Sequence, residues 1–274
     1  MLEPEAVSVK YEVRDAIGSG GFGVVLEVRD LATNELLAMK KLPFDVDGND
    51  NANIKREIFN IIQLGSHDNI VQWLDIFRTP ENQLSIVMER CDSDLAGFLA
   101  LKANREVPMC FNVSLQILAG VVFLHTHVPV IVHRDIKPQN ILMKRNPETN
   151  KIEAKIADFG ISSSDDDVVV LDNATKEVVA RIVYTMKTSK MASGTIPFMG
   201  PEFHAAVDGL GLVDGKFHVD VSSDIFALGL VLTFIFCYND NDYGRKYICT
   251  STAACMTDEV FLITNRTLTK RVYM

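Results

Sequence analysis

The stretch IVHRDIKPQN, residues 131–140, constrains what this chain can fold into more than any other. It places a possible general base (Asp135), a cation (Lys137) and an amide able to ligate a metal (Asn140) within six positions. The proline in this stretch fixes its own backbone angle and disfavours helix before it, which favours a stiff loop. Asp158 follows 23 residues after Asp135, in the run IADFG. This set suits phosphoryl transfer, where a protein mostly positions groups and neutralises charge around magnesium.

The runs HRDIKPQN and DFG resemble the catalytic and metal-binding loops of eukaryotic protein kinases. The resemblance implies an α+β, two-lobed protein-kinase-like fold over residues 11–274. The N-lobe, about 11–90, would be a small antiparallel β-sheet with one helix, and the C-lobe, about 92–238, would be mainly α-helical. Residues 239–274 form a divergent tail without the apolar rhythm of further kinase helices. The resemblance therefore implies a truncated C-lobe.

The motif GSGGFG, residues 18–23, has the G-x-G-x-x-G pattern of several nucleotide-binding loops. In a dinucleotide-binding fold the third glycine opens a helix. Here the continuation is VVLEVRD, whose β-branched residues and alternation favour a strand. The pattern indicates a strand, a glycine loop whose amides can approach phosphates closely, and a second strand, as in the kinase nucleotide cover. A plain glycine-rich hairpin and a dinucleotide-binding dehydrogenase are the alternatives.

The kinase resemblance carries a nucleotide site over to particular residues of this chain. The expected ATP-binding residues are Ile17, Gly18, Ser19, Gly20, Gly21, Phe22, Gly23, Val24, Val25, Ala38, Lys40, Met88, Glu89 and Cys91. Met88 stands where kinases place the residue at the back of the adenine pocket, although a methionine at a strand end is more often core. Glu89 to Cys91 would form the hinge between the lobes, with its backbone facing adenine.

By the same resemblance, Lys40 in LAMK is the strand lysine that orients the phosphates. Glu57 resembles the helix glutamate that pairs with this lysine, and it lies beside isoleucines spaced as in an amphipathic helix. An exposed helix glutamate is the alternative. Asp135 would accept the proton of the substrate hydroxyl, with Lys137 beside it. Asn140 and Asp158 would bind magnesium.

Several elements are expected around these motifs. Strands are predicted over 70–78 and 84–88, and a hairpin over 141–160 with a turn at NPETN. One helix is predicted in SDLAGFLALK, with Ser93 or Asp94 as N-cap. A longer helix follows in MCFNVSLQILAGVVFLHTHV, with one apolar face formed by Val113, Ile117, Val121 and Leu124. Gly65 is placed to end the earlier helix, the one that carries Glu57.

Two further residues are expected to support the catalytic loop. His133 lies in an apolar run, which favours a structural role bonded within the loop over a ligand role. Asp224, in SSDIFALGL, matches the family's buried-helix aspartate, and the resemblance implies that it braces this loop.

The long segment between Asp158 and Glu202 resembles a kinase activation loop, which ends in SGTIPFMGPEF. Arg134 suggests control by phosphorylation there, because a phosphate of about −1.5 to −2 charge could pair with it. The candidate phosphosites are Thr185, Thr188, Ser189 and Ser193. Thr195 occupies the family's GT position and is expected to contact the catalytic loop.

Composition excludes several classes of partner. The formal net charge is −9, which argues against nonspecific nucleic-acid binding. The start lacks a signal peptide, and the longest apolar stretch, residues 225–238, is too short to span a membrane and favours a core helix. Five scattered cysteines favour reduced thiols, and no zinc-spaced ligands accompany His125 and His127. We expect a cytoplasmic protein with protein substrates and a possible dimeric state.

The leading hypothesis is an ATP- and Mg²⁺-dependent serine/threonine protein kinase, because Lys137 follows Asp135 by two residues as in that class. The alternative is a truncated or inactive kinase-like nucleotide-binding regulatory module. A weaker resemblance, in HTHVPVIVHRDIKPQNIL and KIEAKIADFGIS, connects the chain to stress-signalling kinases. These are the inositol-requiring endoplasmic-reticulum sensor and the kinases of initiation factor 2 alpha.

Overall fold

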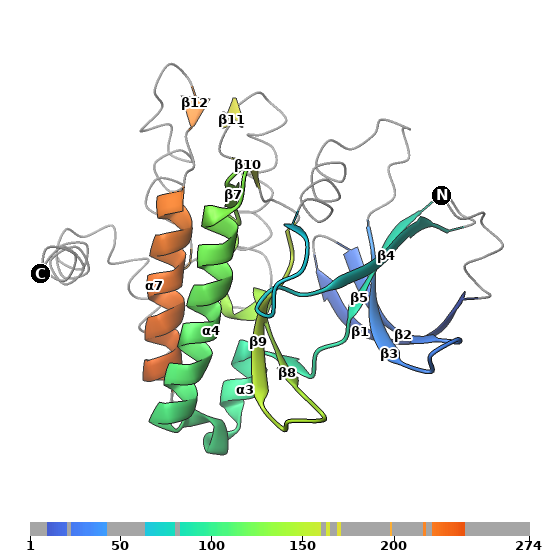
Figure 1. Ribbon diagram of the computed structural model, residues 1–274, viewed down its shortest axis with the longest axis horizontal. Coiled ribbons are helices and arrows are strands. Elements are labelled where there is room, and N and C mark those ends of the chain that lie inside the picture. The colour runs from blue at the N-terminus through green and yellow to red at the C-terminus, as the bar shows by residue number, and fades with distance from the viewer. Residues whose placement is uncertain are drawn as a thin grey trace, which may run out of the picture.

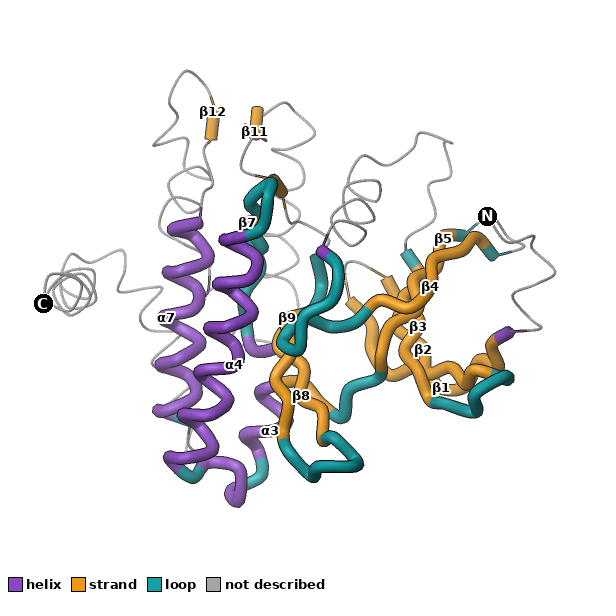
Figure 2. Tube along the Cα trace, viewed as in Figure 1, coloured by secondary structure: helices purple, strands orange, loops and turns teal. Residues whose placement is uncertain are grey.

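A computed structural model of the chain describes residues 10–20, 23–42, 64–79, 83–159, 163–164, 169–170, 198, 216–217 and 221–238. A sheet of five strands forms one lobe, and two long helices lie side by side in the other (Figure 1). A short helix and a hairpin lie between them, close to the long helices (Figure 2). The α+β, two-lobed arrangement expected from the sequence is confirmed.

The N-lobe sheet is antiparallel throughout, in the order β1-β2-β3-β5-β4. Its strands are β1 (Tyr11–Gly20), β2 (Gly23–Asp30), β3 (Leu36–Lys41), β4 (Trp73–Arg78) and β5 (Leu84–Glu89). The residues that follow the glycine motif form β2 and not a helix. This is the context that separates a strand-flanked glycine loop from a dinucleotide-binding loop.

The two faces of this sheet have different roles, because successive side chains of a strand point to opposite faces. One face carries a core of its own, formed by Tyr11, Val28, Leu37, Met39, Phe77 and Val87. The other face looks toward the C-lobe and carries Ala38 and Met88, which pack with Val71 and Ala157. The second face is the one that can border a site between the lobes.

Strand β4 begins at Trp73, three residues later than the sequence predicted. Ile70 instead forms a parallel bridge with Ile156 of the C-lobe hairpin. The Val71 amide donates to the Ile156 carbonyl at 2.9 Å, and the Ile156 amide donates to the Asn69 carbonyl at 2.9 Å. The backbone groups of Asn69 and Val71 therefore bond the hairpin and do not extend the N-lobe sheet, whereas the Gln72 carbonyl accepts from the Glu89 amide of β5 at 3.0 Å.

The C-lobe contains short strands, two 3₁₀ turns and three described helices. In chain order they are β6 (Ser93–Asp94), α3 (Leu95–Ala100), η2 (Lys102–Arg105), α4 (Val107–Thr126), β7 (Ile131–Val132), η3 (Pro138–Asn140), β8 (Ile141–Arg145), β9 (Ile152–Ile156), β10 (Ser163–Ser164), β11 (Val169–Val170), β12 (Lys216–Phe217) and α7 (Val221–Cys237). Asp94 is the N-cap of α3, and its carboxylate accepts from the Gly97 amide at 2.7 Å. The predicted hairpin is β8 paired with β9.

Helices α4 and α7 build the C-lobe core. The predicted apolar face of α4 is buried, and it packs with Ala227, Leu228, Val231 and Ile235 of α7. Of the helices that the structure describes, α4 also has the length and hydropathy of a membrane span. Its buried face lies in this core, as expected for a central helix of a folded domain. Gly120 lets α4 pack closely against Asn69 and Ile156, since a Cβ at this position would lie 2.9 Å from both Asn69 O and Ile156 Cδ1.

Candidate active site

The loop between β7 and η3 is held by a buried histidine. His133 is fully buried, and its Nε2 lies 3.1 Å from the Ala157 carbonyl oxygen. Its Nδ1 accepts from the Asp135 amide at 3.2 Å, and its ring packs edge-on against Phe159. The structural role predicted for His133 is confirmed. It ties the loop that carries Asp135 to the segment that carries Asp158.

Asp135 is the centre of the loop. Lys137 Nζ donates to its Oδ2 at 2.6 Å, and Asn140 Nδ2 donates to the same oxygen at 2.8 Å. Asn140 Nδ2 also bonds the Asp135 carbonyl at 2.8 Å, which fixes the amide orientation. Burial raises the pKa of the Asp135 carboxyl, and the Lys137 charge opposes this only in part. A raised carboxyl pKa is a common property of a general base.

A second carboxylate, that of Asp158, lies in the segment that follows β9. Asp158 has a positive φ of 68°, and its Oδ1 accepts from Lys40 Nζ of β3 at 2.7 Å. Burial acts to raise the pKa of the Asp158 carboxyl, but the Lys40 charge outweighs it, so this pKa lies below its usual range. The two carboxylates therefore differ in pKa. The raised pKa of Asp135 favours acceptance of a proton, whereas the lowered pKa of Asp158 keeps that side chain charged.

Asp224 of α7 braces the loop from the C-lobe core, as the resemblance implied. Its carboxylate is fully buried and accepts from the backbone amides of His133 and Arg134, each at 2.7 Å. His125 of α4 adds a third contact, with Nε2 at 2.8 Å from Asp224 Oδ2. Sequence reasoning did not assign His125 this partner, because the two residues are 99 positions apart.

The expected nucleotide residues on the sheet divide between its two faces. Ala38 and Met88 are buried together, and Val25 of β2 and Leu142 of β8 pack against them. Val24 lies on the opposite face and is 41% exposed. Ile17 is also exposed, and Gly18 pairs with Val25 across β1 and β2.

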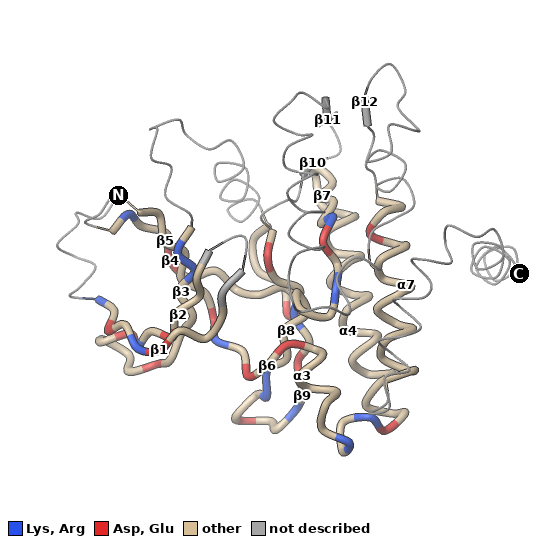
Figure 3. Tube along the Cα trace, turned by 180° about the vertical axis from the view of Figure 1, so that it is seen from behind, with Lys and Arg blue, Asp and Glu red and all other residues tan. Residues whose placement is uncertain are grey.

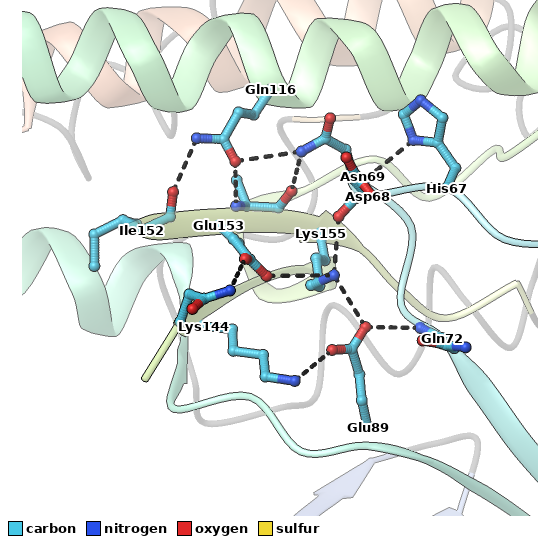
Figure 4. Close-up of polar contacts among 12 residues, drawn as sticks. His67, Asp68, Asn69, Gln72, Glu89, Gln116, Lys144, Ile152, Glu153 and Lys155 are labelled. Carbon is cyan, nitrogen blue, oxygen red and sulfur yellow. Dashed lines mark hydrogen bonds and ion pairs between the residues drawn. The ribbon is translucent and has the colours of Figure 1, made fainter. Parts of the chain in front are cut away.

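At the hinge, Glu89 is the hub of a polar network that the sequence did not indicate (Figure 4). Its carboxylate accepts from the Gln72 amide at 2.9 Å and from Lys144 Nζ at 2.8 Å, and Lys155 Nζ lies 3.2 Å away. Burial acts to raise the pKa of Glu89, but these partners outweigh it and lower that pKa. At Cys91, burial raises the thiol pKa to about 12, so this thiol is a poor nucleophile.

Other expected site residues lie outside the described residues. They are Gly21, Phe22, Glu57, Thr185, Thr188, Ser189, Ser193, Thr195 and Glu202. Ser19, Gly20 and Gly23 are described only as strand residues of β1 and β2. Gly65 has a φ of 63°, the left-handed conformation typical after a helix end.

The fold and site define a two-lobed phosphotransferase-like domain, with ionic groups gathered where the lobes meet. Residues 11–253 match the family model of the protein kinase domain, and the chain belongs to this family. Among solved structures, the fold resembles a chain of the CAK complex from Chaetomium thermophilum bound to ATP-gamma-S. The TM-score is 0.58 and the identity 21%, over 89% of this chain and 69% of that chain. Neither match distinguishes stress-response kinases from other members.

Proposed function

We propose that the protein is a serine/threonine kinase that transfers the γ-phosphate of ATP to a protein hydroxyl. The observation that supports this most is the Asp135 carboxylate, held at Oδ2 by Lys137 and Asn140. Both contacts end on the same oxygen, which leaves Oδ1 to accept the proton of a substrate hydroxyl. The raised pKa of Asp135 suits that role, because proton transfer is favoured when the base is close in pKa to working conditions.

Lys137 would neutralise charge on the transferred phosphoryl group, because its ammonium lies beside the base at 2.6 Å. The position of this lysine two residues after the base is the feature that favours serine and threonine over tyrosine. The alternative of an inactive regulatory module is not favoured, since base, lysine and amide are intact, and the lysine and the amide both contact the base.

Asn140 and Asp158 fit a magnesium site. Asn140 gives its amide nitrogen to Asp135, so its carbonyl oxygen remains as a ligand, and the lowered pKa of Asp158 keeps that side chain anionic. One carboxylate and one amide oxygen, completed by phosphates and water, are the partners that Mg²⁺ accepts. Bound there, the ion would neutralise the developing charge on the phosphate oxygens.

Lys40 would orient the phosphates. In this structure it pairs with Asp158, and its buried stem comes from the sheet face that carries Ala38. We propose that Glu57 also pairs with this lysine and so holds it on the phosphates, as in other members of the family.

The adenine ring would lie between Ala38 and Val25 from the N-lobe and Leu142 from the C-lobe, with Met88 behind it. The backbone of Glu89 to Cys91 would bind the edge of the base. Val25, and not Val24, is the valine of β2 that borders this apolar space. The resemblance to a chain from an ATP-gamma-S complex is consistent with a nucleotide in this cleft.

Phosphoamino-acid analysis tests the proposal. The purified chain is incubated with γ-labelled ATP, Mg²⁺ and a mixed protein substrate, and the labelled product is hydrolysed to free amino acids. We expect label on serine and threonine, and none without Mg²⁺. Label on tyrosine would overturn the proposed specificity, and no label on any residue would overturn the kinase activity.

A further inference from the structure

Glu27 connects the strand after the glycine motif to the hinge. It lies on β2, four residues after Gly23, and Arg90 follows directly after β5. Arg90 Nε lies 2.7 Å from Glu27 Oε2, which is an ion pair between strand and hinge. The Glu27 side chain is 12% exposed and that of Arg90 is 35% exposed. Arg90 Nε is itself buried, whereas the rest of the Arg90 side chain is partly exposed, so the pair is only partly accessible to solvent.

A second guanidinium reaches the same carboxylate from β1, with Arg14 Nη1 at 3.7 Å from Glu27 Oε1. This contact coincides with a break in the backbone ladder. On β1 the paired residues go from Val13 to Ala16, a step of three, whereas the partner positions on β2 differ by two. Arg14 and Asp15 therefore both oppose Glu27, as in a β-bulge. The side-chain contact bridges β1 and β2 where their hydrogen bonding is interrupted.

The face of Glu27 links this cluster to the nucleotide cleft. Glu27 pairs in register with Ala38, and it shares a strand face with Val25 because side chains alternate. Val25 and Ala38 both belong to the apolar group around Met88. Seen from behind, acidic and basic residues are interspersed around β1 (Figure 3). Glu27 therefore extends the sheet face of Val25 and Ala38, which borders the cleft, toward the hinge.

We propose that Glu27 is a positioning residue that holds the flap strands β1 and β2 on the hinge through Arg90 and Arg14, and so sets the residence time of ATP. The proposal rests on the proposed function, since it assigns ATP to this cleft. A partly exposed ion pair contributes little, which keeps the strands able to lift for nucleotide exchange. Loss of the pair should therefore change opening and release by about two- to fivefold, and not abolish binding.

The test uses the full chain with the substitutions Glu27→Gln, Arg90→Ala and their combination. Arg29→Ala is the matched control. It removes a guanidinium from β2, the strand of Glu27, but this guanidinium lies near Glu12 and not at the hinge. Hydrogen exchange of the β1 and β2 amides is measured without nucleotide. The dissociation rate of a fluorescent ATP analogue with Mg²⁺ is measured by stopped flow at low salt and at 0.5 M salt.

We expect the amides of β1 and β2 to exchange about two- to fivefold faster in Glu27→Gln than in wild type, with a smaller increase in Arg90→Ala. The double variant should match Glu27→Gln, since Arg90 acts through Glu27. Nucleotide release should accelerate in parallel, and the difference should shrink in high salt because salt screens exposed charges. Arg29→Ala should leave nucleotide release at the wild-type rate, because its own cross-strand contact with Glu12 does not reach the hinge.

Three results would overturn the inference: unchanged amide exchange in Glu27→Gln, an effect in the double variant equal to the sum of the singles, or faster exchange with unchanged nucleotide release. A wild-type chain that binds no ATP analogue would contradict the proposed function instead. In that case the exchange measurement, made without nucleotide, still decides whether Glu27 holds the strands.

Discussion

At the scale of single residues, the environment separates carboxylates that the sequence presents as equivalent. Asp135 and Asp158 are both partly buried and in contact with a lysine, yet the pKa of the first is raised and that of the second is lowered. The difference follows from which influence dominates: burial at Asp135, and the Lys40 charge at Asp158. A base and a metal ligand need these opposite properties, so the local environments fit the proposed roles.

Glu89 supplies a prediction about pH. Its pKa is lowered, so it contributes stability that is present above about 4.3, the ordinary glutamate value, and is lost as pH falls through the lowered pKa. We expect Glu89→Gln to reduce the free energy of unfolding by about 1–3 kcal/mol at pH 7, because Lys144 and Lys155 lose a charged acceptor. Urea unfolding at a series of pH values should show the two proteins converging below about pH 4.

Glu153→Gln is the control for this comparison. Glu153 is 31% exposed and its Oε2 lies 3.6 Å from Lys155 Nζ, so its loss should cost under about 1 kcal/mol. A stability difference between wild type and Glu89→Gln that stays constant from pH 7 into acid would contradict the assignment.

The same network shows the limit of sequence reasoning at this scale. The sequence placed Glu89 at the hinge because of its position in the motif order, but it gave no sign that the side chain faces Lys144 and Lys155. Lys144 and Lys155 are 55 and 66 positions away from Glu89, and only the tertiary fold brings them into contact with it. His125 was missed for the same reason, whereas His133 was predicted because its apolar flanks already indicated burial.

At the scale of elements, close packing of α4 fixes where β9 and the segment before β4 can lie. The elements themselves were predictable, since the β8–β9 hairpin and the α4 face follow from turn residues and helical periodicity. The start of β4 was not predictable, because Ile70 and Val71 read as strand but join β9 of the C-lobe, whereas Gln72 bonds Glu89 of β5. Local pattern predicts extended backbone, and only the tertiary partner decides which ladder it joins.

Two helical glycines give a matched prediction at this scale. Alanine has higher helix propensity than glycine by about 1 kcal/mol, and a Cβ placed at Gly229 of α7 has no atom of another described element within 4 Å. Gly229→Ala should therefore stabilise the protein by about 0.5–1 kcal/mol. Gly120→Ala should destabilise it by about 1–3 kcal/mol, because its Cβ would lie 2.9 Å from a backbone oxygen. Urea unfolding of both variants measures the difference, and stabilisation by Gly120→Ala would show that α4 has room to shift.

At the scale of the whole molecule, the two lobes bring together groups that are far apart in sequence. Lys40 of the N-lobe sheet reaches Asp158 of the C-lobe across 118 positions. The order of the motifs predicted that both residues belong to one site, but it named Glu57, and not Asp158, as the partner of Lys40. Charge and periodicity alone predicted separate elements. The family resemblance supplied their arrangement, which the fold confirms.

The most direct measurement of the central claim is the rate of γ-phosphate transfer in Asp135→Asn relative to wild type, with Mg-ATP affinity measured on both. Asparagine keeps the size of the side chain but cannot accept the hydroxyl proton. We expect transfer to fall by about 10²- to 10⁴-fold, the range for loss of a general base, while nucleotide affinity changes by less than about threefold. Transfer at the wild-type rate in Asp135→Asn would contradict the assignment of Asp135 as the base and of this loop as the catalytic centre.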